Sequence, residues 1–288
     1  MKLFNTIQEK LNNKKFYFIN NNPLFENSLN EISKAYKIGV DTEFNWRNTY
    51  YPEICLIQIS TQKNIFIFDL ISLKKVQPLK NIFNNKDIKK IFHSSRGDLS
   101  VLKSSLDIET NNLFDTQIAE NFLENDFSYQ KSYKDLVKNY FYVNLPKSET
   151  NSDWIKRPLS QDQIKYSADD VRYLIKIHDL QRKLLRKQNK MDLVKDAFLE
   201  EKKVSELTFL ESRLRRFMKK KNKPTKMEEK IFIWREKEAM QQNVPPNKIF
   251  QEKYIKILSK SILKNEHNKE RWIFSDVDLF NKLLNSLK

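Results

Sequence analysis

The sequence predicts an α/β fold, in which a mixed five-stranded sheet flanked by helices is followed by a small all-α domain. Short apolar segments bounded by polar residues come first, and helical patterns alternate with the later ones. From Ser132 onward the apolar residues recur at helical spacing, with Pro146 and Pro158 as interruptions. Strands followed by alternating helices are typical of a mixed sheet with helices on both faces.

The five expected strands follow one another along the chain. Three of them, at 38–44, 54–59 and 65–68, have short polar connections, which predicts an antiparallel meander. The fourth and fifth, at 90–93 and 113–116, alternate with helical segments. The helices expected around these strands lie at 24–36, at 73–83, in the segment 94–102, at 117–123 and from 160. The segment 16–19 could add an edge strand.

Two acidic residues stand two positions apart in the first of these strands. Side chains at i and i+2 leave the same face of a strand, so Asp41 and Glu43 should project together. Two neighbouring carboxylates are unfavourable in a half-buried site unless a cation lies between them, and Mg²⁺ or Mn²⁺ prefers such oxygen ligands. A strand that ends in two solvated acids explains the pair equally well. Asp98 likewise has an ordinary explanation, because an acid in the first turn of a helix is stabilised by the helix dipole.

A helix that begins near residue 160 contains a further pair of polar residues. Ser160 and Gln163 have the spacing of a capping box, which predicts the helix start. Tyr166 and Asp170 are then one turn apart on a shared face. Asp169 points about 100° away from Asp170 around the helix, so only one of the two can face a given site.

Composition favours a polyanionic partner in a reducing compartment. An excess of 53 Lys and Arg over 37 Asp and Glu gives a net charge of +16, which indicates nucleic acid before a membrane, although a Lys- and Asn-rich composition inflates the figure. The segment 213–226 holds eight basic residues and no acidic one, as expected of either a solvated linker or a phosphate-binding surface. The single Cys55 and the absence of a long apolar run predict a cytoplasmic protein that does not enter the membrane.

Several of these motifs occur together, in order, in a known family. They are Val40-Asp41-Thr42-Glu43-Phe44, Tyr50-Tyr51-Pro52 with Leu56-Ile57-Gln58, His93 with Asp98-Leu99, Phe114-Asp115-Thr116-Gln117, and Tyr166-Ser167-Ala168-Asp169-Asp170. Over about 15–185 the sequence resembles ribonuclease D, in the tyrosine subclass of the DEDD 3′→5′ exonucleases, which have a ribonuclease H-like fold. The segments 231–239, 243–245 and 249–250 resemble, more loosely, a helical HRDC-type nucleic-acid-binding domain. The resemblance implies an exonuclease domain at 1–185, a basic helical linker at 186–226 and an HRDC-like domain at 227–288.

The resemblance also implies a catalytic site that holds two divalent metal ions, Mg²⁺ or Mn²⁺. Asp41 would bridge the ions, Glu43 and Asp170 would complete the first site, and Asp98 would help to hold the second. Tyr166 would position the attacking water, since a phenol of pKa near 10 is a poor base at neutral pH. The subclass pattern of Tyr, three residues and Asp selects Asp170 over Asp169.

Four further residues are expected near substrate. Phe44 and Trp46 could stack on the terminal base or sugar, or they could be ordinary packing residues. Thr42 and His93 are adjacent to the motifs.

The function implied is a cytoplasmic, monomeric 3′→5′ exoribonuclease that releases nucleoside 5′-monophosphates. Its RNA partners would be tRNA precursors, trimmed at their 3′ ends, and other small structured RNAs. Two alternatives are a 3′→5′ exonuclease that acts on DNA and a non-catalytic RNA-binding module. The presence of all four acids and the tyrosine argues against the second alternative.

Overall fold

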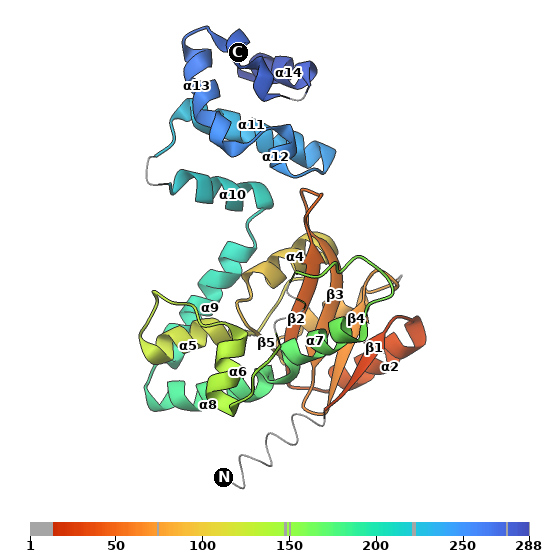
Figure 1. Ribbon diagram of the computed structural model, residues 1–288. Coiled ribbons are helices and arrows are strands. Elements are labelled where there is room, and N and C mark those ends of the chain that lie inside the picture. The colour runs from red at the N-terminus through yellow and green to blue at the C-terminus, as the bar shows by residue number, and fades with distance from the viewer. Residues whose placement is uncertain are drawn as a thin grey trace. The chain divides into compact units, whose positions relative to one another are not determined.

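A mixed sheet of six strands forms the centre of the first part of the chain (Figure 1). The computed structural model describes residues 14–73, 75–146, 149, 151–220, 223–274 and 276–287. Within these residues the chain divides into two compact units, one of residues up to 45 with 54–206, the other of 46–53 with 207–288.

The strand order is β1-β4-β3-β2-β5-β6. The strands are β1 Lys15–Ile19, β2 Lys37–Asn45, β3 Glu53–Ser60, β4 Asn64–Asp69, β5 Lys89–Phe92 and β6 Leu113–Asp115. β3 pairs antiparallel with β4, whereas the pairs β1–β4, β2–β5 and β5–β6 are parallel. The expected mixed α/β fold is therefore confirmed.

The expected strand count of five was one too low. The segment around 16–19 forms β1, which lies at the edge of the sheet, with Lys15 opposite Asn64 and Ile19 opposite Phe68. Its residues are mostly exposed and only Ile19 is fully buried. An edge strand pairs on one side only, so its sequence lacks the continuous apolar run of a central strand.

Helices cover both faces of the sheet and enclose two apolar cores. Ile65 and Ile67 of β4 join one core, and the alternating Phe66 and Phe68 join the other. The first core is completed by α5 Thr116–Glu124, α6 Tyr133–Phe141, α7 Gln161–Arg172, α8 Leu174–Lys187 and α9 Met191–Ser205. The second is completed by α2 Asn22–Ile32, α3 Pro78–Asn84 and α4 Arg96–Leu106. Because both faces are buried, β4 is apolar at consecutive positions.

Local signals explain where the helices begin. Ser160 and Gln163 form the expected capping box at the start of α7. Asn21 caps α2, whose second residue is Pro23, and α3 likewise begins with proline, at Pro78. The helix expected at 73–83 is thus shorter, since proline favours the first helical position, where its missing N–H costs nothing. Residues described between 142 and 160 form no helix, contrary to the continuous helical pattern expected from Ser132.

The second unit is helical and has a core of its own. Its elements are α10 Phe209–Met218, α11 Lys226–Gln242, α12 Pro246–Ile249, η1 Glu252–Tyr254, α13 Ile255–Leu263, η2 His267–Ile273 and α14 Val277–Leu287. The segment 186–226, expected to be a basic helical linker, forms α9, which belongs to the first unit, and α10, which belongs to the second. No helix among the described residues combines the length and apolar composition of a membrane span.

Candidate active site

Three acids from two distant parts of the chain meet at the end of β2. Asp41 and Glu43 lie on this strand and Asp170 lies on α7. One carboxylate oxygen of each residue lies within 4.8 Å of those of the other two. This spacing suits three oxygen ligands around one hard divalent cation.

A close approach between strand and helix explains how Asp170 reaches β2. A Cβ at Gly39 would lie 2.5 Å from Ser60 Oγ and 2.9 Å from the Cβ of Leu174, so glycine is required here. The Ser60 hydroxyl donates a 2.8 Å hydrogen bond to the carbonyl of Val171, which fixes the end of α7 on the sheet. Asp170 precedes that carbonyl by one residue.

Asp98 is buried in the first turn of α4, as expected. The buried Thr42 hydroxyl donates a 2.6 Å hydrogen bond to Asp98 Oδ1. Asp98 stands outside the three-acid cluster but raises the pKa of the Glu43 carboxyl. Thr42 therefore links the β2 strand to the fourth acid, a contact that motif adjacency alone did not predict.

Burial and mutual repulsion disfavour the charged forms of the four acids. Burial is the main cause that raises the pKa of Asp41 and of Glu43, and the neighbouring carboxylates raise both further. The pKa of Asp98 rises through burial and then through the charge of Asp41. Burial also raises the pKa of Asp170 to about 7, although a hydrogen bond from Tyr166 opposes the rise. A bound divalent cation would relieve this repulsion, so the residues present fit a metal site.

The two consecutive aspartates of α7 have different surroundings. Asp169 accepts a 2.6 Å hydrogen bond from Arg172 Nε, and its carbonyl accepts one of 3.0 Å from the Tyr133 hydroxyl. Only Asp170 joins Asp41 and Glu43. The helical phase therefore directs one carboxylate to the cluster and the other to an arginine.

Tyr166 lies beside the cluster on α7 and is flanked by an aromatic ring and a cation. It is hydrogen-bonded to Asp170. The Trp154 ring lies 6.1 Å from its ring centroid, and Lys134 Nζ lies 5.6 Å from it. Lys134, which also lowers the pKa of Asp170, was missed at the sequence level because a lone lysine in a Lys-rich chain gives no signal.

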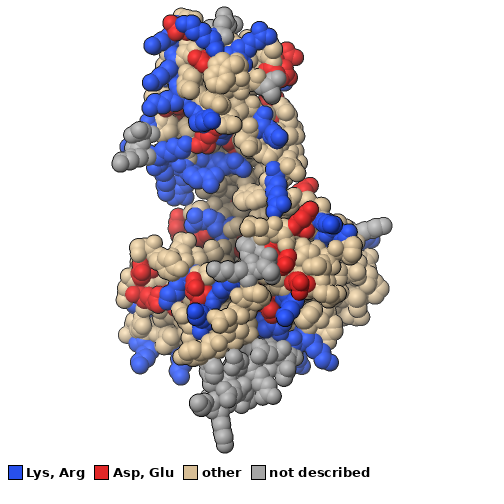
Figure 2. Space-filling view, viewed as in Figure 1, with Lys and Arg blue, Asp and Glu red and all other residues tan. Residues whose placement is uncertain are grey.

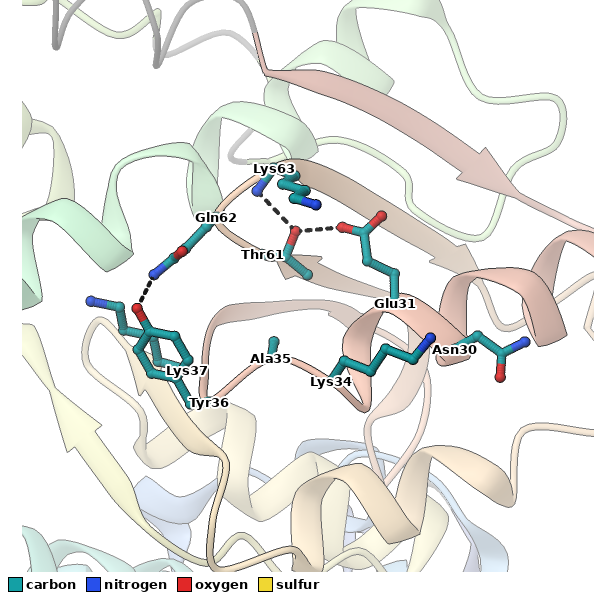
Figure 3. A pocket seen from close by; sticks show the side chains of 9 residues that line it. All are labelled: Asn30, Glu31, Lys34, Ala35, Tyr36, Lys37, Thr61, Gln62 and Lys63. Carbon is teal, nitrogen blue, oxygen red and sulfur yellow. Dashed lines mark hydrogen bonds between the residues drawn. The ribbon is translucent and has the colours of Figure 1, made fainter.

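A cavity of about 420 Å³ in the same unit is a poorer candidate (Figure 3). It is lined by the end of α2, by the residues that lead from α2 into β2, and by the β3–β4 turn, whereas the acids lie at the end of β2. Its one carboxylate, Glu31, accepts hydrogen bonds from the side chains of Thr61 and Asn64. The acid cluster is therefore the candidate active site.

Comparison with known proteins agrees with this geometry. Residues 16–186, more than half of the chain, match the family described as 3′-5′ exonuclease. The chain belongs to the 3′-5′ exonuclease family. All four acids and Tyr166 lie within the matched residues.

Relatives of this chain include proteins named ribonuclease D. That of Xanthomonas oryzae pv. oryzae is 38% identical over 170 residues, which are 58% of this chain and 46% of that protein. The chain thus spans about half the length of this curated relative. The structure of Escherichia coli RNase D, described as an exoribonuclease involved in structured RNA processing, matches with a TM-score of 0.77 at 23% identity, over 93% of this chain and 75% of that one. Brucella melitensis NrnC with bound Mg²⁺ matches with a TM-score of 0.57 at 24% identity, over 67% and 91% of the two chains. The ribonuclease D resemblance and its fold are confirmed.

The remaining predicted contacts of the exonuclease lie outside the acid cluster. His93 is bonded through Nδ1 to the Thr116 hydroxyl at 2.9 Å and through Nε2 to the Lys131 carbonyl at 3.1 Å, and burial lowers its pKa. The Phe44 ring packs against Gly97, where a Cβ would lie 3.5 Å from it. Trp46 is 52% exposed and belongs to the second compact unit.

One further buried acid, Asp115, organises the start of α4 and was not singled out as a site residue. Asp115 accepts hydrogen bonds from the backbone N–H groups of Ser94 and Ser95 at 3.2 and 2.6 Å. It also caps α5 by accepting from Gln117 and Ile118. The helix cap is a local signal, but the contact with a turn twenty residues earlier is visible only in the fold. By holding that turn, Asp115 sets where α4 and its Asp98 begin.

Proposed function

We propose that this protein is a 3′→5′ exoribonuclease that hydrolyses RNA 3′ ends to nucleoside 5′-monophosphates with the help of two divalent metal ions. The cluster of Asp41, Glu43 and Asp170, with Asp98 and Tyr166 beside it, is the observation on which the proposal rests. The ribonuclease D relatives and the structure of NrnC with bound Mg²⁺ support it. A non-catalytic role would leave four mutually repelling acids without a purpose.

The side chains divide the work of phosphodiester hydrolysis. When bound, the two metal ions would lower the pKa of the attacking water and stabilise the leaving 3′-oxygen. Asp41 would contact both ions, Glu43 and Asp170 would hold the first, and Asp98 would help to hold the second. The Tyr166 hydroxyl, placed beside Asp170, would orient the water, and Lys134 next to it would attract the scissile phosphate.

The basic surface of the helical unit favours a nucleic acid as the partner. Lys and Arg side chains gather over α10 (Figure 2). Arg215, Arg216, Lys219 and Lys220 are exposed there. Such a surface neutralises backbone phosphates and so adds salt-dependent affinity. We name tRNA precursors and other small structured RNAs as substrates, and we place the enzyme in the cytoplasm as a monomer.

One experiment tests the activity and separates RNA from DNA. The purified protein is incubated with 3′-extended tRNA and with single-stranded DNA of matched length, each with Mg²⁺, with Mn²⁺ and with EDTA. We expect 5′-monophosphates from the RNA with either metal and none in EDTA. Faster degradation of the DNA would show that DNA is the substrate, and degradation in EDTA would contradict the metal mechanism.

A further inference from the structure

We propose that Asn243 is a positioning residue, which holds the chain segment that follows the metal-binding strand and thereby keeps the end of β2 in place for catalysis. The inference rests on the proposed function. The segment 46–53 leaves β2 after Asn45 and enters β3, yet it belongs to the helical unit. The helical unit therefore restrains a loop that directly continues the strand of Asp41 and Glu43.

The side chain of Tyr50 anchors this segment. It is fully buried in the core of the helical unit, with Phe217, Ile231 and Phe232 among the other members. The Arg213 guanidinium lies 5.2 Å from its ring centroid. Removal of a large aromatic ring from water is favourable, so withdrawal of the segment from the helical unit is costly.

Asn243 adds hydrogen bonds that fix the backbone of the same segment. Its Oδ1 accepts from the backbone N–H groups of Tyr50 at 3.2 Å and of Tyr51 at 3.3 Å. Asn243 ends α11 in the left-handed conformation, with φ of 47°. Glycine and asparagine both suit that conformation, but only asparagine or aspartate supplies a side-chain acceptor. The residue therefore has two separable roles, as a helix cap and as an acceptor.

Loss of the Asn243 acceptor should lower kcat on RNA substrates of every length. Glu43 stands seven residues before Tyr50, and Phe44 and Trp46 lie between them. A loosened segment would leave the end of β2 with one restraint fewer, so Glu43 would spend less time in productive geometry. If the helical unit only captured RNA, loss of this contact would raise KM and leave kcat unchanged on every RNA.

Three variants of the full chain separate these roles. Asn243→Gly keeps the left-handed cap and removes the acceptor, whereas Asn243→Asp keeps both. Asn265→Gly is the matched control, since Asn265 is another left-handed asparagine of the same unit, with φ of 57°. The measurements are kcat and KM on an RNA tetranucleotide and on 3′-extended tRNA, with hydrogen exchange of the Tyr50 and Tyr51 amides.

We expect Asn243→Gly to accelerate exchange of the two amides and to lower kcat on the tetranucleotide about tenfold, because small misplacements of catalytic groups are costly. Asn243→Asp and Asn265→Gly should stay within about twofold of wild type in both measurements. Faster exchange with unchanged kcat on the tetranucleotide would overturn the proposal, as would an effect confined to KM for the tRNA. A wild-type protein that releases no nucleotide from either RNA would refute the proposed function instead.

Discussion

Removal of metal should make folding stability depend on pH through the acid cluster, and Asp170→Asn should reduce that dependence. The pKa of Asp170 is about 7 in the folded protein, against an ordinary value of 3.8. A group whose pKa is raised by folding contributes stability that is fully present below its unfolded pKa and is lost as pH rises through the folded value. Metal-free protein should therefore lose stability between about pH 4 and pH 7.

The magnitude follows from the size of the rise. Each tenfold change in an ionisation constant corresponds to about 1.4 kcal/mol. The rise of the Asp170 pKa from 3.8 to about 7 therefore corresponds to roughly 4 kcal/mol at pH 8. The raised pKa values of Asp41, Glu43 and Asp98 act in the same direction. The free energy of unfolding of a domain is usually roughly 5–15 kcal/mol, so a change of this size is a large part of the total.

The assay is urea unfolding in EDTA at pH 5 and at pH 8, repeated with saturating Mg²⁺. Wild type in EDTA should be less stable at pH 8 than at pH 5, and Mg²⁺ should restore stability at pH 8. Asp170→Asn should make the dependence in EDTA shallower than that of wild type and should respond less to Mg²⁺. Asp169→Asn is the control, because Asp169 pairs with Arg172 outside the cluster, and it should keep the wild-type profile. Parallel profiles for wild type and Asp170→Asn in EDTA would refute the reasoning.

Three further predictions concern activity. Asp41→Asn should lower kcat in Mg²⁺ by about a thousandfold or more and leave RNA binding largely unchanged, because the substitution removes a proposed metal ligand. A variant that keeps a tenth of wild-type turnover would exclude the bridging role. Asp170→Ala should be as inactive as Asp41→Asn, whereas Asp169→Ala should keep most activity in the same assay, and the reverse ranking would contradict the geometry of α7. Simultaneous substitution of Arg215, Arg216 and Lys219 by Ala should raise KM for 3′-extended tRNA and leave kcat unchanged. The slope of binding affinity against salt concentration should fall by about two to three, because each lost phosphate contact removes about 0.7–0.9. An unchanged KM and slope would show that these residues do not bind RNA.

Local sequence signals predicted much of the first unit. The alternation that places Asp41 and Glu43 on one face of β2 and the capping box of α7 are both short-range patterns, and both hold in the structure. The edge strand β1 was only a weak signal, since its residues are mostly exposed. The choice between Asp169 and Asp170 depended on the resemblance, because helical phase alone does not say which face meets the sheet.

Contacts between distant residues were beyond the reach of sequence patterns. Gly39 allows the start of α8, at Leu174, to approach β2, but a glycine within a strand signals equally a bulge or a close approach. Asp115, at the end of β6, holds the turn at Ser94 and Ser95 that follows the neighbouring strand β5, which a helix cap does not imply. The motif Tyr50-Tyr51-Pro52 contributed to the resemblance without any indication that Tyr50 belongs to the helical core.

The burial of Tyr50 changes how the role of the helical unit should be tested. Deletion of residues 207–288 would remove the basic residues proposed to bind RNA and would also uncover Tyr50 and delete Asn243, the acceptor for its backbone. A fall in kcat after such a deletion would therefore not distinguish lost capture from a displaced strand end. Substitution of the exposed basic residues of α10 removes the charge and leaves the Tyr50 anchor in place. Asn243→Gly keeps the charge and removes the hydrogen bonds to the backbone of Tyr50 and Tyr51. If capture and positioning are separate functions, the first change should act on KM for long RNA and the second on kcat for RNA of any length.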